Sequence, residues 1–321
     1  MEFGFSIPAR GPLATPANIL ALARMGEETG FGFAAVSDHI VIPRDIASRY
    51  PYSEDGAFAG RASGEYLEQL SLIAFLAAGT PRLRLLTSIM VLPHRNPLYA
   101  AKALATIDVL SGGRLIVGCG AGWLREEFEA LGAPPFGRRG AVSNEYIRAF
   151  KELWTSDNPQ FAGEFVAFSN IRALPQPVQK PHPPIWIGGE SPAALRRAGE
   201  LGDAWYPIGN NPRYPMKTID QLRAGFERVK RHASESGRSG KMPGLSYSAG
   251  WYCDTAAEKL PDGSRRILTG TPAQIGDDIE QLQKLGAGHL LLGIQSDTLE
   301  GTFERMQRFA SHVRPHVGKQ A

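Results

Sequence analysis

Two hydrophobic patterns alternate along almost the whole chain. Short runs that are nearly all apolar are typical of strands buried on both faces of a parallel sheet. The longer segments between them repeat their apolar residues every three to four positions, which indicates helices with one buried face. The predicted strands are residues 2–7, 33–38, 83–91, 115–118, 184–187, 204–208, 245–252 and 289–294. The predicted helices are residues 16–30, 65–78, 98–110, 143–154, a segment that begins at 192, 216–235, 272–285 and 299–313.

Three of the predicted helices have a recognisable first turn. Thr15-Pro16, Ser191-Pro192 and Thr271-Pro272 each place a hydroxyl residue directly before a proline. The hydroxyl can cap the first free N–H groups of a helix, and a proline at the first helical position has no N–H to leave unpaired. These pairs therefore predict where the helices start.

Eight strand–helix units in sequence predict an α/β fold, a closed (β/α)8 TIM barrel that forms a single domain over residues 1–321. An open, doubly wound sheet is the alternative. Three insertions interrupt the pattern, at 43–63 after strand two, 155–183 after helix four and 253–270 after strand seven. The first is rich in Arg and Tyr, and it is either a lid over the barrel mouth or an arm in a dimer.

The composition is that of a globular protein, with 43% hydrophobic and 21% charged residues. The 35 basic and 32 acidic residues leave a net charge of +3, which predicts no nucleic-acid partner. No run of about 18 apolar residues predicts a membrane span, and no signal peptide is recognisable. The two cysteines form no Cys-x-x-Cys motif. We therefore expect a cytoplasmic protein.

The second predicted strand ends on two adjacent ionisable residues. The run FAAVSDHIVIP, residues 33–43, closes its first apolar stretch with Asp38 and His39. Active sites of barrels lie at the carboxyl ends of the strands, so both residues are candidates for the mouth. Neighbouring residues on a strand point to opposite faces, so both reach the mouth only if the chain already turns at residue 38. Histidine ionises near neutral pH, which makes His39 the candidate general acid or base.

Other strand ends carry candidate ligand-binding residues. Thr87 and Ser88 are either ordinary strand residues or hydroxyl donors to a ligand. Arg95 is either a solvated side chain or a clamp for an anion. The glycines of GCGAGW, residues 118–123, would let a ligand approach the backbone closely. The run Gly188-Gly189-Glu190-Ser191 leads into a helix and is either a capped tight turn or an anion cradle.

The sequence lacks the residues that several other barrel enzymes require. No His-x-His follows the first strand, and no pair of carboxylates spans the mouth as a glycosidase requires. Neither a Gly-x-Ser-x-Gly elbow nor a Gly-x-x-x-x-Gly-Lys loop is present. We therefore predict no metal site. The mouth is better suited to a phosphorylated, planar organic cofactor that carries the difficult chemical step.

Three segments then carry a family resemblance: VSDHIVIP (36–43), TSIMVLPHRNPLYAAKALATIDVLSGGRLIVGCGAGW (87–123) and PPIWIGGESPAALRRAGELGDAW (183–205). The chain resembles the bacterial luciferase-like oxidoreductases, a (β/α)8 family that uses FMN or the deazaflavin coenzyme F420. The resemblance implies that Asp38 and His39 lie near the cofactor ring. It also implies a cis peptide between Ser88 and Ile89 that forms a bulge behind the ring. The remaining residues that it assigns to the cofactor are Gly120, Ala121, Gly122, Gly188, Gly189, Glu190 and Ser191. Thr87 and Arg95 are added to the cofactor-binding candidates from their places at the strand ends.

One position departs from the family pattern. Members that oxidise sugar phosphates carry a Glu after the glycine run, whereas this chain has Trp123. This departure argues against sugar-phosphate oxidation and favours a small, rather apolar substrate. The resemblance of VSDHIVIP to F420-dependent members favours F420-dependent hydride transfer at C5 of the deazaflavin. An FMN-dependent monooxygenase is the alternative, and a degenerate flavin-binding barrel is the non-enzyme alternative. In this interpretation Asp38 orients His39 or bonds the cofactor, and the protein is a homodimer.

Overall fold

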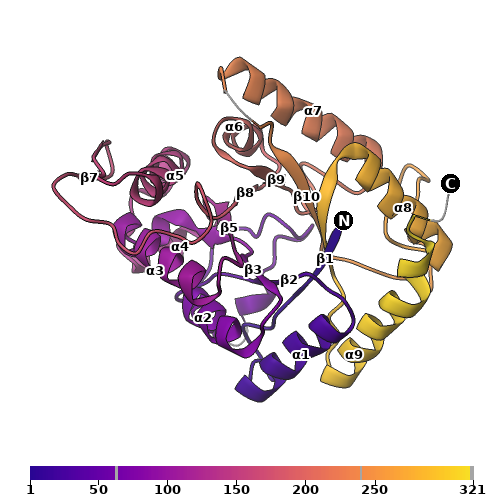
Figure 1. Ribbon diagram of the computed structural model, residues 1–321. Coiled ribbons are helices and arrows are strands. Elements are labelled where there is room, and N and C mark those ends of the chain that lie inside the picture. Colours follow the sequence, from indigo (N-terminus) through magenta and orange to yellow (C-terminus); the bar gives the residue numbers. More distant parts are fainter. Residues whose placement is uncertain (62–63, 239–240, 319–321) are drawn as a thin grey trace.

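The computed structural model describes residues 1–61, 64–238 and 241–318, and in them eight parallel strands close a barrel (Figure 1). The strands are β1 (Glu2–Ser6), β2 (Phe33–Val36), β3 (Arg84–Thr87), β5 (Leu115–Gly120), β8 (Ile185–Gly188), β9 (Ala204–Tyr206), β10 (Gly244–Ala249) and β11 (Ala287–Leu292). Strand β1 pairs with both β2 and β11, and β3 pairs with β5, so the sheet has no open edge. The predicted barrel is confirmed, and the open doubly wound sheet is wrong.

The helices form a ring around the strands, with the first and the last side by side (Figure 1). They are α1 (Pro16–Glu28), α2 (Gln69–Gly79), α3 (Pro97–Leu110), α4 (Arg125–Ala130), α5 (Arg139–Thr155), α6 (Pro192–Leu201), α7 (Ile219–Glu235), α8 (Pro272–Leu285) and α9 (Leu299–Arg308). The hydroxyls of Thr15, Ser191 and Thr271 each accept the backbone N–H three residues on, as the sequence predicts. Helix α4 was not predicted, because its six residues are too few to show a period.

The third predicted strand is divided into two. Residues 83–91 form β3 and then β4 (Met90–Val91), and the peptide between Ser88 and Ile89 is cis. The Ile89 side chain enters space that two glycines leave free, because a Cβ added to Gly120 or Gly188 would overlap it. The Ile89 side chain, which follows β3, therefore requires glycine at these two positions of neighbouring strands.

The insertions differ in structure. Residues 155–183 contain the short antiparallel pair β6 (Phe161–Ala162) and β7 (Ala167–Phe168), which projects beyond the helix ring (Figure 1). Glu145 on α5 fixes this hairpin by accepting three successive backbone N–H groups, of residues 164 to 166. Residues 43–61 instead fold across the carboxyl ends of the strands, against α4. No described helix is long and apolar enough to cross a membrane.

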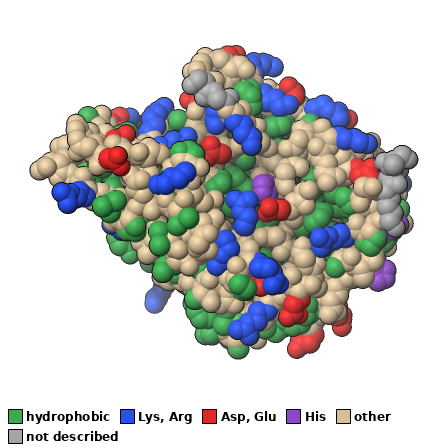
Figure 2. All heavy atoms as spheres, in the orientation of Figure 1, with side chains coloured by type: hydrophobic (Ala, Val, Ile, Leu, Met, Phe, Trp, Pro, Cys, Tyr) green, Lys and Arg blue, Asp and Glu red, His purple; other side chains and the backbone are tan. Residues whose placement is uncertain are grey.

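Aromatic side chains fill the barrel interior and close its amino-terminal end. Phe33, Trp186 and Tyr206 are buried together inside the barrel. His289 lies 4.6 Å from Trp186 between ring centroids, and both His289 and Arg84 lie 3.7 Å from the Glu2 carboxylate. Burial, and then the charge of Arg84, lowers the pKa of His289 to about 4. Figure 2 views this end, where acidic, basic and histidine side chains meet near the centre. Ligands must therefore enter from the opposite end.

The close contact of Ile89 with Gly120 predicts that a methyl group added at Gly120 lowers the stability of the fold. Gly120→Ala should lower the free energy of unfolding by about 1–3 kcal/mol, because the added Cβ overlaps a buried side chain. Gly288→Ala in β11 is the matched control, since its Cβ meets nothing within 4 Å. Urea unfolding of both variants measures the difference, and equal stabilities would contradict the described fit of Ile89.

Candidate active site

The chain turns directly after β2 and brings Asp38 and His39 to one cavity. Strand β2 ends at Val36, two residues before Asp38, so the alternation of a strand no longer applies. Asp38 and His39 both line a cavity of about 290 Å³ at the carboxyl ends of the strands, and Tyr50, Ala121 and Ser191 contribute to the same lining. The chain therefore turns by residue 38, which both residues require in order to reach the mouth.

Asp38 serves the structure of this end of the barrel. Its carboxylate accepts two hydrogen bonds of 2.8 Å from Arg95, one to each oxygen, and a third of 2.8 Å from the Val91 N–H. Arg95 also donates to Glu68 at 2.7 Å. Asp38 is thus not the residue that orients His39, and Arg95 is not free to clamp a ligand anion. Both expectations are corrected, because these buried charges satisfy each other.

Glu127 on α4 takes the role expected of Asp38. Its Oε2 lies 2.7 Å from His39 Nδ1, and its Oε1 accepts from the N–H groups of Ile40 (2.8 Å) and Val41 (3.2 Å). Burial alone raises the pKa of Glu127, but the bonds with His39 and with the backbone outweigh it and hold the pKa below the usual range. An ionised carboxylate only accepts, so we assign the proton to Nδ1, which leaves the Nε2 lone pair available.

A second histidine lies on the other side of Glu127. His94 Nδ1 is 3.8 Å from Glu127 Oε1, and its ring packs on Phe128 with centroids 4.7 Å apart. Neither ring nitrogen has a hydrogen-bond partner among the described residues. Burial lowers the pKa of His94 and outweighs the attraction of Glu127. The buried site thus contains one carboxylate between two imidazoles, and only His39 is bonded to it.

Several residues predicted to contact a ligand have other partners. Thr87 donates its hydroxyl to the Gly118 carbonyl at 2.8 Å, so it is committed to the backbone. Ser88 lines the cavity, and its hydroxyl lies 3.1 Å from the Tyr206 hydroxyl. Of the glycine run, Gly120 faces Ile89, whereas Ala121 and Gly122 line the cavity.

The segment predicted to be an anion cradle forms a tight turn and a capped helix start, and two basic residues that sequence reasoning missed line the same cavity. Ser191 caps α6 and lines the cavity, and the positive φ of +102° at Gly189 forms the turn before it. Arg139 and Arg197 line the same cavity. Neither forms an ion pair within the described residues, and their hydrogen bonds go to backbone carbonyls and to one amide. Burial lowers the pKa of both guanidinium groups.

Glu190 supports a loop and does not face an anion. Its carboxylate accepts the Ile208 N–H at 2.6 Å and the Asn211 side chain at 3.0 Å. Burial raises the pKa of Glu190 to about 7, against the opposing effect of these two bonds. Its carboxylate therefore takes no part in the predicted cradle, which depends on the backbone N–H groups before α6.

The first insertion covers the cavity with aromatic rings. Phe58 of the insertion, and Tyr66 just after it, each lie 5.0 Å from His39 between ring centroids, and Tyr50 of the insertion lies 5.1 Å from Trp123. Glu126 on α4 tethers the insertion by accepting the N–H groups of residues 47 and 48. Trp123 therefore belongs to an aromatic wall beside His39. This arrangement is that of a lid over the mouth.

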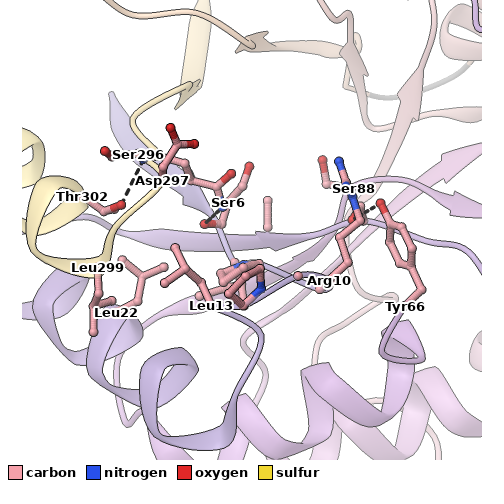
Figure 3. Close-up of a pocket in the computed structure, with 18 residues that line it drawn as sticks. Ser6, Arg10, Leu13, Leu22, Tyr66, Ser88, Ser296, Asp297, Leu299 and Thr302 are labelled. Atoms are coloured by element: carbon pink, nitrogen blue, oxygen red, sulfur yellow. Dashed lines mark hydrogen bonds between the residues drawn. The ribbon is translucent and has the colours of Figure 1, made fainter. Parts of the chain in front are cut away.

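A second cavity of about 470 Å³ adjoins the first. Ser37, Tyr66 and Ser88 line both. Figure 3 shows this second cavity between the loop that follows β1 and the loop that follows β11. We call the two spaces the His39 cavity and the β1 lobe. Because the two cavities share a wall, a molecule bound in the lobe would lie next to a molecule bound in the His39 cavity.

The raised pKa of Glu190 predicts a pH dependence. A carboxyl group with a folded pKa of about 7 contributes stability below its unfolded pKa, and that contribution is lost as the pH rises through 7. Stability should fall by up to about 3 kcal/mol between pH 4.5 and 8, and Glu190→Gln should remove that part of the slope. The control is Glu304→Gln, an exposed position on α9. Chemical denaturation across this pH range measures both, and an unchanged slope in Glu190→Gln would contradict the assignment.

Comparison with known proteins agrees with this geometry. The luciferase-like monooxygenase family model matches residues 1–310. An FMNH2-dependent dimethylsulfone monooxygenase from Pseudomonas putida is 30% identical, over 84% of this chain and 83% of its own. An uncharacterized Mycobacterium tuberculosis protein is 32% identical over 82% and 89%. An F420-dependent secondary alcohol dehydrogenase shares the fold, with a TM-score of 0.74 at 19% identity over 98% of each chain. The chain therefore belongs to the luciferase-like monooxygenase family of flavin- or F420-dependent oxidoreductases.

Proposed function

We propose that the His39 cavity binds the deazaflavin coenzyme F420 through its phosphate, and that the protein is an F420-dependent oxidoreductase acting on a small organic molecule. The observation that carries the proposal is the pair Arg139 and Arg197. Both line the cavity without an ion-pair partner in the described residues, and Ser191, which caps the amino terminus of α6, lines the same cavity. Two unpaired cations next to a helix N-terminus favour a bound phosphate.

The rest of the cavity suits a flat ring. Ser88, Ile89, Ala121 and Gly122 supply a wall without charged side chains, and the aromatic residues of the first insertion face it. The cofactor, once bound, would accept or donate a hydride at the ring. The protein would hold the phosphate at one end of the cavity and exclude water with Tyr50, Phe58 and Trp123 at the other.

His39 would move the proton that accompanies the redox step. Glu127 fixes Nδ1, so Nε2 is the nitrogen that can exchange a proton with a molecule in the cavity. A histidine held this way by a buried carboxylate keeps one tautomer and one orientation. Asp38 has no part in this role, since all its hydrogen bonds are to Arg95 and to the backbone.

Two cofactors fit the same donors, and the sequence favours F420. The run Val36–Pro43 most resembles F420-dependent members of the family. An FMN-dependent monooxygenase is the second candidate, because the named Pseudomonas relative uses reduced FMN. A homodimer and a cytoplasmic location stay predictions. We do not carry the apolar substrate forward, since serine, threonine and charged side chains line much of the β1 lobe.

Anaerobic titration with reduced F420 and reduced FMN, followed by fluorescence, tests the choice of cofactor. We expect F420 to bind at least tenfold more tightly, and tighter binding of FMN would overturn this part of the proposal.

Arg139→Met should weaken binding of the preferred cofactor about ten- to a hundredfold, because it removes a charged hydrogen-bond donor. Arg138→Met is the control, since the adjacent Arg138 is half-exposed and pairs with Glu164. The phosphate-free form of the cofactor should bind both variants equally.

The proton-transfer role predicts a second outcome. His39→Gln should lower turnover about 10²- to 10⁴-fold while cofactor affinity stays within about threefold of wild type. Turnover is measured as bleaching of the bound cofactor with a substrate drawn from a panel of alcohols and aldehydes. Glu127→Gln should also lower turnover and change its pH profile, because the amide no longer fixes the tautomer of the ring. Undiminished turnover in His39→Gln would show that another group moves the proton.

A further inference from the structure

The β1 lobe has the size and position of a substrate site. Its volume of about 470 Å³ exceeds that of the His39 cavity, and Ser37, Tyr66 and Ser88 form the boundary between the two. The loops after β1 and β11 supply most of its wall. A cofactor in the His39 cavity would therefore adjoin any molecule held in the lobe.

Arg10 is the single basic residue in the described lining of the lobe. It lies at the end that borders the His39 cavity, together with Ser88 and Tyr66 (Figure 3). Its side chain is half-buried and makes one hydrogen bond of 3.3 Å, to the Ala59 carbonyl in the lid. Within the described residues it forms no ion pair, whereas Arg95, Arg265 and Arg308 each bond a carboxylate.

The pKa of a neighbouring tyrosine indicates where the Arg10 charge lies. Burial raises the pKa of Tyr50 to about 12, and the positive charge of Arg10 opposes that rise. Tyr50 lines the His39 cavity and Arg10 lines the lobe, so the charge lies near the boundary between them. The acidic residue of the lobe, Asp297, is exposed at the opposite end beside Ser296 and Thr302 (Figure 3). It therefore leaves the Arg10 charge uncompensated.

We propose that Arg10 determines substrate specificity by binding an oxyanion, a carboxylate or sulfonate, on the substrate. The unpaired guanidinium would fix this group at the boundary, and the hydroxyls of the lobe would surround the rest of the molecule. The proposal rests on the proposed function for the location of the cofactor, and it adds the chemical class of the substrate. A charged hydrogen bond of this kind changes affinity about ten- to a hundredfold.

Two probes that differ mainly in charge test the proposal. Hexanesulfonate and hexyl methyl sulfone have the same alkyl chain and a similar head group, and only the first is an anion. Calorimetric titration of the cofactor-loaded protein should give at least tenfold tighter binding of the sulfonate. In Arg10→Met that preference should fall to threefold or less, with the affinity for the sulfone unchanged.

Three further variants separate charge from structure. Arg44→Met removes an exposed arginine of the first insertion that lines neither cavity, and it should keep the preference. Arg10→Lys retains the charge and should keep part of the preference, and it serves if Arg10→Met does not fold. Asp297→Asn should leave the preference for the sulfonate intact or increase it.

Three results would contradict the role of Arg10. Equal affinity of the wild type for both probes, or an unchanged preference in Arg10→Met, overturns the proposal. So does a loss of cofactor affinity in Arg10→Met, since Arg10 would then bind the cofactor. Failure of the proposed function is separate: if neither F420 nor FMN binds, titration of the cofactor-free protein with the same probes still measures the charge preference of the lobe.

Discussion

The buried carboxylate of Glu127 organises the mouth of this barrel. It joins two segments that are far apart in the sequence, because Glu127 lies on α4, which follows β5, and its carboxylate bonds the ring of His39 and the backbone N–H groups of Ile40 and Val41. A buried charge without partners would be strongly destabilising, so the fold of the mouth requires all these bonds together. The orientation of His39 and the start of the lid therefore depend on one side chain.

Around Glu127, some charged side chains of the mouth have a partner and others do not. Arg95 is bonded to both Asp38 and Glu68, and Glu190 is bonded to a loop. Arg139 and Arg197 at one end, and Arg10 at the boundary with the lobe, have no carboxylate partner in the described part of the chain. Paired ions stabilise the fold, whereas unpaired cations that are at least partly buried favour a bound anion. This difference is the basis for the proposed phosphate site and for the proposed substrate oxyanion.

The fold could be predicted from local patterns because each strand–helix unit is encoded in a continuous segment. Apolar runs, helical periods and Thr-Pro or Ser-Pro starts all occur within about 30 residues, and the strand ends then follow from barrel geometry. The same reasoning brought His39, Ser88, Ala121, Gly122 and Ser191 to one cavity. It failed where partners are distant: Glu127 is 88 positions from His39, and nothing in the local sequence distinguishes it from its neighbour Glu126.

The sequence by itself determined the barrel, the location of the mouth and the family. Tertiary structure alone decided the pairing within the mouth: that Arg95 binds Asp38, that Glu127 binds His39, and that Gly120 and Gly188 make room for Ile89. The physical reason is that strand and helix formation depend on periodic burial along a segment. Whether an ionisable residue faces a ligand depends instead on which opposite charge the fold places beside it.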